Sequence, residues 1–162
     1  MSVLRLPEYR RLRTPGIVSN RADLARELIV NGTFASDVSG WSATAPASIA
    51  FSGGTLRVSR TNASYATDMC YQDVPVVVGE WYALKFDYVY ENTSGTTLTF
   101  DFSWDGGTTD IQQFTTPSIR NGIFHLFQAV GNTLRIIFKP SDIATGVCGI
   151  DNVSIKRILY VP

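Results

Sequence analysis

The sequence predicts an all-β protein in which two antiparallel sheets pack face to face as a β-sandwich. Three observations support this fold class. From residue 28 onward, short stretches alternate between apolar and polar residues, as half-buried strands do. Turn-forming residues separate these stretches at intervals of roughly 8–15 positions, a spacing typical of sandwiches. Residues 1–27 lack this pattern and form a separate, arginine-rich arm.

Length and composition indicate one folded domain with an appendage. The chain has 162 residues, of which 44% are hydrophobic and 17% are charged, and this composition excludes an intrinsically disordered protein. Its 14 basic and 14 acidic side chains cancel, so we expect no nucleic-acid partner. No apolar run is long enough to span a membrane, and the first residues lack the apolar segment of an export signal.

Residues 1–27 predict a docking arm. They carry six arginines and three acids, whereas the rest of the chain has a net charge of −3. Pro7 and Pro15 prevent a long helix, but residues 20–28 can form a short one with Asn20 as its N-cap. Apolar anchors interleave with arginines, which pair well with carboxylates. The expected docking residues are Leu4, Arg5, Leu6, Tyr9, Arg10, Arg11, Leu12 and Arg13. A solvated tail and a nucleic-acid contact are the alternatives.

The strands of the body follow in order. Residues 48–52 and 55–59 flank Gly53-Gly54, which predicts a hairpin. Residues 65–78 contain one or two strands, interrupted at Pro75. In residues 81–90 the alternation is strong, and it separates an apolar face from a polar one. The apolar face carries Tyr82, Leu84, Phe86, Tyr88 and Tyr90, and the polar face carries Lys85, Asp87 and Val89.

Residues 97–104 alternate in the same way. Leu98, Phe100, Phe102 and Trp104 form the apolar side, and Thr99, Asp101 and Ser103 form the polar side. We expect this polar side to continue the surface that Lys85 and Asp87 begin, with further contributions from Gln112, His125 and Arg135. Four more strands are predicted over residues 111–114, 122–130, 133–139 and 148–158.

Four segments in this order resemble a known superfamily. Residues 27–34 read ELIVNGTF with Gly40-Trp41 soon after, 78–86 read VGEWYALKF, 134–138 read LRIIF, and 149–155 read GIDNVSI. Together they resemble carbohydrate-binding modules of families 4, 9 and 22, which are related to galactose-binding-like domains. The resemblance implies a non-catalytic jelly-roll sandwich over residues 28–162. Trp41, Tyr82, Phe86 and Phe138 are expected in its core, and Gly32 and Gly40 in tight turns.

The resemblance also implies where ligands would bind. In these families the aspartate of the closing motif and the opening motif often share a structural calcium ion. Here Asp151 and oxygens near Asn31 and Thr33 are the weak candidates, because Ala35 stands where the family usually has a glutamate ligand. Sugar rings usually stack on exposed aromatic side chains beside polar ones. The candidate glycan-binding residues are Tyr65, Tyr71, Lys85, Asp87, Tyr88, Tyr90, Asp101 and Trp104.

The remaining reactive residues do not form a catalytic pattern. His125 is the sole histidine, and no nucleophile motif surrounds it. The acids Asp87, Asp101, Asp105 and Asp110 could supply a carboxylate pair for glycoside hydrolysis, but ordinary solvated acids of strands and turns are the preferred explanation. Cys70 and Cys148 are either two buried thiols or one bridge between distant strands.

The implied fold, the absent export signal and the arm together predict a bacteriophage virion protein. It would decorate the capsid or belong to a neck, fibre base or tail. Virion proteins would then be its partners, in multiple copies or as a homo-oligomer, and host glycan adhesion a secondary role. The alternative is a glycan-binding module of a polysaccharide-degrading system, which would bind glycan without the arm. A small glycoside-active enzyme is a third hypothesis.

Overall fold

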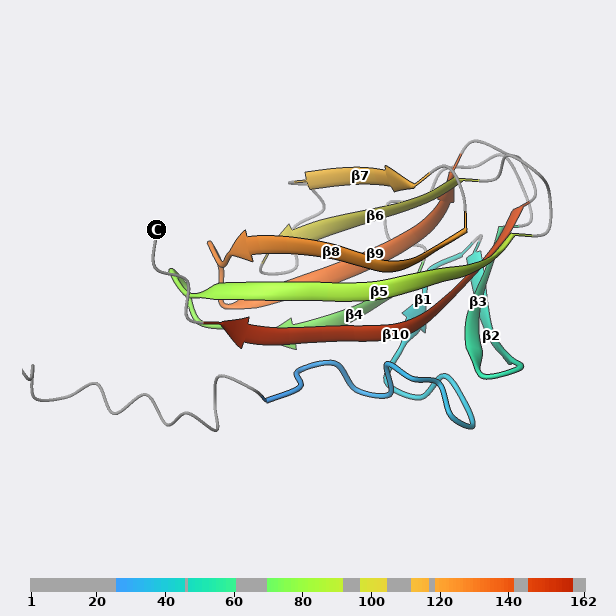
Figure 1. Cartoon of the computed structure of the whole chain (residues 1–162), viewed down its shortest axis with the longest axis horizontal. Coiled ribbons are helices and arrows are strands. Elements are labelled where there is room, and N and C mark those ends of the chain that lie inside the picture. The colour runs from blue at the N-terminus through green and yellow to red at the C-terminus, as the bar shows by residue number, and fades with distance from the viewer. Residues whose placement is uncertain are drawn as a thin grey trace, which may run out of the picture.

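The computed structural model describes residues 26–45, 47–60, 70–91, 97–104, 112–116, 119–141 and 146–158, and these form an antiparallel β-sandwich (Figure 1). One sheet contains, in spatial order, β2 (Ala47–Ser52), β3 (Thr55–Arg60), β10 (Gly146–Ile158), β5 (Trp81–Glu91) and β8 (Arg120–Gln128). We call it the β5 sheet. The other contains β1 (Ser42–Ala43), β4 (Cys70–Pro75), β9 (Thr133–Ser141), β6 (Thr97–Trp104) and β7 (Gln112–Thr116), and we call it the β9 sheet.

The two-sheet, all-β prediction is therefore confirmed. Within the described ranges there is no helix, and so none that could span a membrane. Residues 1–25, which contain all the expected docking residues, lie outside the described residues. The division of the chain into an arm and a sandwich at residue 28 stays a prediction. The helix expected over residues 20–28 is wrong at its end, because residues 26–28 are not helical and Glu27 forms a β-bridge with Lys156; residues 20–25 lie outside the described residues.

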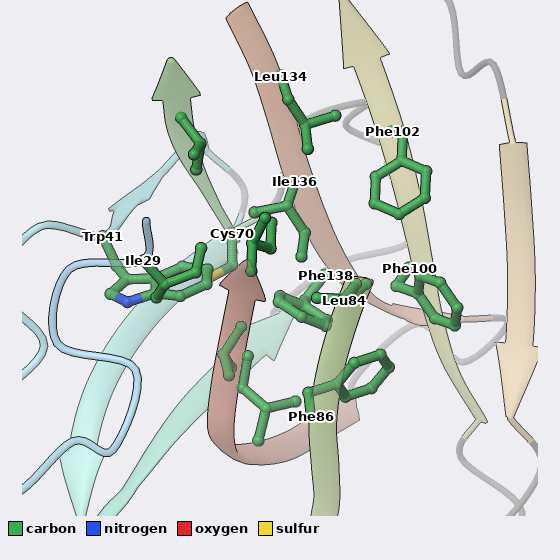
Figure 2. Packing of buried hydrophobic residues seen from close by; sticks show 14 of the residues in the cluster. Ile29, Trp41, Cys70, Leu84, Phe86, Phe100, Phe102, Leu134, Ile136 and Phe138 are labelled. Carbon is green, nitrogen blue, oxygen red and sulfur yellow. The ribbon is translucent and has the colours of Figure 1, made fainter. Parts of the chain in front are cut away.

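The apolar residues that alternate along the strands point into the interior of the sandwich, as the sequence predicts. Tyr82, Leu84, Phe86 and Tyr88 of β5 are buried, with exposed fractions of 0–2%. Apart from the stacked pair of Tyr82 and Phe127, the ring contacts are tilted or edge-on, which suits the quadrupoles of the rings. Phe86 lies 4.9 Å from Phe100 and 5.0 Å from Phe138, measured between ring centroids, and so joins the two sheets (Figure 2). The expected core positions of Trp41, Tyr82, Phe86 and Phe138 are confirmed.

One expectation about the polar faces is wrong. β5 and β6 follow each other in sequence but lie in different sheets, so their polar sides do not form one surface. Lys85 and Asp87 lie on the outer face of the β5 sheet, whereas Asp101 lies on the outer face of the β9 sheet. Thr99, Asp101 and Ser103 are also almost fully buried, with exposed fractions of 0–1%. Alternation separates the two sides of one strand but does not identify its neighbours.

Glycines occupy the positions of the turns that need a positive φ or leave no room for a side chain. Gly53 and Gly54 have φ values of 59° and 78°, so both central residues of the predicted β2–β3 hairpin have the positive φ that a two-residue turn favours. Gly40 also has a positive φ, of 84°. Gly32 is required for a different reason, because a Cβ atom there would lie 1.9 Å from the carbonyl oxygen of Val153.

The segment over residues 26–41 runs beside β10 and closes one side of the sandwich (Figure 1). Gln72 of β4 holds it from inside. Its Oε1 accepts a hydrogen bond from the Val30 N–H at 2.8 Å, and its Nε2 donates to the carbonyls of Val30 and Gly40, both at 3.0 Å. The Val153 N–H donates to the Gly32 carbonyl at 2.9 Å. This segment is thus fixed to both sheets.

The two cysteines are buried free thiols, which decides between the alternatives that the sequence leaves open. Burial raises the pKa of the Cys70 thiol, so this group stays protonated. The Sγ atom of Cys148 lies 3.6 Å from the Tyr88 hydroxyl oxygen, within the core.

Candidate functional site

The candidate glycan-binding residues are distributed over three places. Tyr71 and Asp101 lie on the outer face of the β9 sheet, and Lys85 and Asp87 lie on the outer face of the β5 sheet. Tyr88 is fully buried in the core, which rules out the glycan contact expected for it. Trp104 points inward and packs against the core, where its ring lies 6.0 Å from that of Phe127. Tyr65 and the side chain of Tyr90 lie outside the described residues.

On the outer face of the β9 sheet, three side chains form what we call the Tyr71 cluster: Tyr71, Asp73 and Arg135. Asp73 and Arg135 are directly opposite each other on β4 and β9. Nε and Nη2 of Arg135 donate to the two carboxylate oxygens of Asp73 at 2.7 and 2.9 Å, a bidentate pair. The guanidinium carbon lies 4.0 Å from the centroid of the Tyr71 ring, a cation–π contact.

The cluster therefore presents rigid, planar groups at the surface. The side chain of Asp73 is 44% exposed and that of Arg135 is 18% exposed, and Tyr71 is half-buried. A carboxylate and a guanidinium side by side offer acceptors and donors to neighbouring hydroxyl groups. The phenol ring adds an apolar surface with a polar edge.

Further along the same face, the charges are buried. Lys139 of β9 forms an ion pair with Asp101 of β6, and both side chains have an exposed fraction of 0%. Ile137, which lies between Arg135 and Lys139 on this face of β9, is also fully buried. Asp101 is thus a structural residue whose charge is compensated by a neighbouring cation. It does not reach the surface, contrary to the expectation that it contacts a glycan.

On the outer face of the β5 sheet, candidates from two separate predictions meet in one polar groove of about 540 Å³. Its lining includes Glu27, Asn31, Thr33, Lys85, Asp87 and Lys156. Lys85 and Asp87 were expected to contact glycan, and Asn31 and Thr33 to contribute to a calcium site. Asn152 and Ser154 of β10 complete the groove.

Glu27 and a β-bulge shape this groove. Oε1 of Glu27 accepts hydrogen bonds from the N–H groups of Leu28, Ile29 and Ile155 at 3.0, 3.0 and 2.8 Å, and Oε2 accepts one from the Ser154 hydroxyl at 2.6 Å. The register of β10 against β5 shifts between Asp151 and Ser154, and Asn152 there has a φ of 52°. Bulges re-aim side chains in this way, often beside binding sites.

Some of the oxygen atoms expected for a calcium site already accept hydrogen bonds within the protein. The Gly32 carbonyl already accepts the Val153 N–H, and Oδ1 of Asp151 accepts the N–H of Asn152 at 2.7 Å. The Asn31 amide nitrogen donates to Oδ1 of Asp37 at 2.8 Å. The described part of the chain contains no cluster of three or more acidic, histidine or cysteine ligands. A calcium ion needs six to eight oxygens, and the described residues offer fewer acidic ligands than such a site usually has. The calcium hypothesis stays a prediction.

The residues considered for catalysis do not come together. Asp87 and Asp101 lie on opposite outer faces of the sandwich, so they cannot act on one glycosidic bond. Asp105 and Asp110 lie outside the described residues. His125 faces the interior rather than the polar surface, with ring centroids 6.3 and 5.7 Å from Phe100 and Phe102, and burial lowers its pKa. The side chain of Gln112 is outside the described residues.

Sequence reasoning missed Asp73, Lys139 and Glu27. Asp73 lies two residues after Tyr71 and therefore on the same side of β4, and Lys139 shares its side of β9 with Arg135. This period-two spacing was the available signal. The pairing of β4 with β9, which brings Asp73 to Arg135, is not visible in the sequence.

No family model and no curated protein matches the sequence. Solved structures resemble the fold. A CBM4 module superposes with a TM-score of 0.59 at 14% identity, over 80% of this chain and 99% of that chain. The CBM22-1 xylan-binding domain of Xyn10C from Paenibacillus barcinonensis superposes with a TM-score of 0.56 at 16% identity, over 86% of this chain and 99% of that chain.

A third structure, CBM61 in complex with β-1,4-galactotriose, superposes with a TM-score of 0.51 at 13% identity, over 82% of this chain and 99% of that chain. The chain therefore has the fold of carbohydrate-binding modules, as the sequence resemblance implies.

Proposed function

We propose that this chain is a non-catalytic carbohydrate-binding module and that the Tyr71 cluster contacts the glycan. The observation that carries the proposal is the cluster itself: an aromatic ring, a guanidinium and a carboxylate fixed on adjacent strands of the β9 sheet. Two charged groups in fixed geometry can bind neighbouring sugar hydroxyls, and the ring can contact the apolar face of a sugar. The fold shared with CBM4, CBM22 and CBM61 modules supports this function.

Because the Arg135 guanidinium already lies over the Tyr71 ring, the pair would act as one preformed surface. Preformed side chains lose little conformational entropy when a ligand binds. The Asp73 pair holds the guanidinium plane, so removal of Asp73 would loosen Arg135 as well as remove an acceptor. We therefore expect all three residues to affect glycan affinity.

Isothermal titration calorimetry with soluble xylan and β-1,4-galactan tests the proposal. We expect binding of one of them, weakened about tenfold by Tyr71→Ala or by Arg135→Gln. Phe124→Ala, which removes a 60% exposed aromatic side chain from β8, is the matched control and should bind like the unchanged protein. Equal loss in all three variants, or unchanged affinity in the two cluster variants, would contradict this site.

The virion hypothesis stays a prediction. Its docking residues lie outside the described residues, and the fold does not favour a capsid, neck or tail protein over a glycan-binding module. The expected virion partners, localisation and multi-copy state stay predictions with it. Co-sedimentation of the full-length chain with bacteriophage particles, lost when Arg10, Arg11 and Arg13 are replaced by serine, is the result that this hypothesis requires.

A further inference from the structure

The acidic and basic side chains of the groove on the β5 sheet differ in their contacts. Both carboxylate oxygens of Glu27 accept hydrogen bonds within the protein, as described above. Both oxygens of Asp87 also accept hydrogen bonds, Oδ1 from the Gly122 N–H and Oδ2 from the Asn152 amide at 2.8 Å. The acids of the groove therefore hold its walls together and have few acceptor positions left for a ligand.

The two lysines have no such role. Among the described residues, none forms a hydrogen bond or ion pair with the ammonium group of Lys85 or Lys156, and both side chains are exposed on the groove. Lys85 is opposite Ser154 on β10, and Lys156 is two residues further along that strand. Diagonal neighbours in a sheet are about 7–8 Å apart, so both ammonium groups can reach one anionic group between them. The carboxylates of Glu27 and Asp87 balance the charge of the lysines, but their oxygens accept hydrogen bonds in the groove walls, so the ammonium groups remain available for a direct contact.

The other residues of the groove restrict the chemical class of the ligand that bears the anionic group. Around the lysines lie the amides of Asn31 and Asn152 and the hydroxyls of Thr33 and Ser154, with no aromatic side chain. Such a surface suits a ligand rich in hydroxyl groups and offers little to an apolar one. A volume of about 540 Å³ lies within the usual range for small-molecule sites.

We propose that this groove is a second saccharide site, specific for a carboxylate-bearing sugar of the hexuronic acid class. Lys85 and Lys156 bind the carboxylate, and the amides and hydroxyls around them bind the sugar hydroxyls. The site lies on the opposite face of the sandwich from the Tyr71 cluster and does not depend on it. The chain would thereby hold two saccharide units, one on each face.

Nuclear magnetic resonance titration of the full chain with D-glucuronate tests the site, with D-glucose as the neutral counterpart. We expect glucuronate to shift the backbone amide signals of Lys85, Asn152 and Ser154 in low salt, and glucose to shift them far less at the same concentration. Since the attraction is electrostatic, added sodium chloride should weaken the binding. Lys85→Gln combined with Lys156→Gln should weaken it at least about tenfold.

Arg120→Gln, which removes an exposed cation of β8 that does not line the groove, is the matched control and should keep the glucuronate shifts. Retained binding in the double lysine variant would overturn the proposal. So would equal affinity for inorganic phosphate, because the groove would then recognise an anion and no sugar. The Tyr71 site is tested independently of the groove. Polysaccharide binding at the Tyr71 cluster should be lost in Tyr71→Ala and kept in the double lysine variant, so the failure of one site can be distinguished from the failure of the other.

Discussion

The strands β5 and β6 alternate similarly in sequence, but the polar side chains that they place on the two outer faces of the sandwich differ in burial. On the β5 sheet, the polar residues Lys85 and Asp87 of β5 remain accessible, and together with Lys156 of β10 they line a groove. On the β9 sheet, the polar residues of β6 are buried, and Asp101 forms an ion pair with Lys139 at zero exposure. The part of the β9 sheet around Tyr71 and Asp73 remains at the surface. Equal alternation in two strands therefore leads to a ligand groove on one face and to a closed, charge-paired layer on the other.

A charged side chain therefore affects the stability of the protein differently on the two faces. On the open face, water solvates Lys85 and Lys156, so they are available to a ligand at little cost in stability. On the closed face, Lys139 and Asp101 have lost their water and depend on each other.

Asp101→Ala should reduce the free energy of unfolding by about 3–5 kcal/mol, because Lys139 would remain buried without its carboxylate partner. Urea denaturation measures this change. The control is Asp73→Ala, which breaks an ion pair on the same sheet where the carboxylate is 44% exposed and should cost about 0–1 kcal/mol. Similar losses in the two variants would mean that the β6 side of this face is as open as the Tyr71 side.

A double variant distinguishes the effect of the unpaired Lys139 charge from a general loss of packing. Asp101→Leu combined with Lys139→Met replaces both charges by apolar side chains, and well-packed replacements of buried pairs are often neutral or stabilising. We expect the double variant to recover most of the stability lost in Asp101→Ala. A double variant as unstable as the single one would show that packing, and not the uncompensated charge, causes the loss.

Gly32→Ala tests the open face and should cost about 3 kcal/mol, at the upper end of overpacking effects. Its Cβ atom would lie 1.9 Å from the Val153 carbonyl oxygen, so the segment that walls the groove would have to move away from β10. Thermal or urea unfolding measures the loss. Gly54→Ala is the comparison, since its Cβ meets nothing within 4 Å and only its positive φ opposes the change, at a cost of about 1 kcal/mol.

Asp151→Asn should stabilise the protein at neutral pH by a few tenths of a kcal/mol, about the size of a cross-strand charge effect. Burial, together with the charge of Asp87 directly opposite, raises the pKa of Asp151. An acid with a raised pKa favours the folded state at low pH, and this contribution is lost as the pH rises from the ordinary value of 3.8 through the raised one. The variant should therefore equal the unchanged protein in acid and exceed it near neutrality.

Asp37→Asn provides the opposite case. Hydrogen bonds donated by the backbone and hydroxyl of Ser39 lower the pKa of Asp37, so its charged form favours the folded state. This contribution is present above the ordinary pKa and is lost as the pH falls through the lowered one. Unfolding measured from acidic to neutral pH should show the two variants changing with opposite sign, and a common sign would contradict the assignment.

Calcium should have the smallest effect. After treatment with a chelator, added calcium ions should leave the Tm unchanged, because the described residues contain no cluster of three or more acidic, histidine or cysteine ligands. A Tm that rises with calcium concentration would instead reveal a site that binds the folded state.

The sequence predicted most of the strands and the core. Alternation over residues 81–90 identified the buried side of β5, and Gly53-Gly54 located the hairpin between β2 and β3. It also identified Lys85 and Asp87 as surface candidates, because both are out of phase with the apolar residues of their strand. These features depend on neighbours in the chain, so local patterns contain the information.

Only the tertiary structure decided which of these residues meet. It brought Asp73 to Arg135, joined Lys85 with Glu27 from the segment before the first strand, and buried Asp101 and Tyr88. The reason is physical: alternation states which residues share one side of a strand, whereas strand order and the covering of a face depend on contacts between residues distant in sequence. The strands and the core were therefore determined locally, and the two candidate binding surfaces were determined by the packing of the sheets.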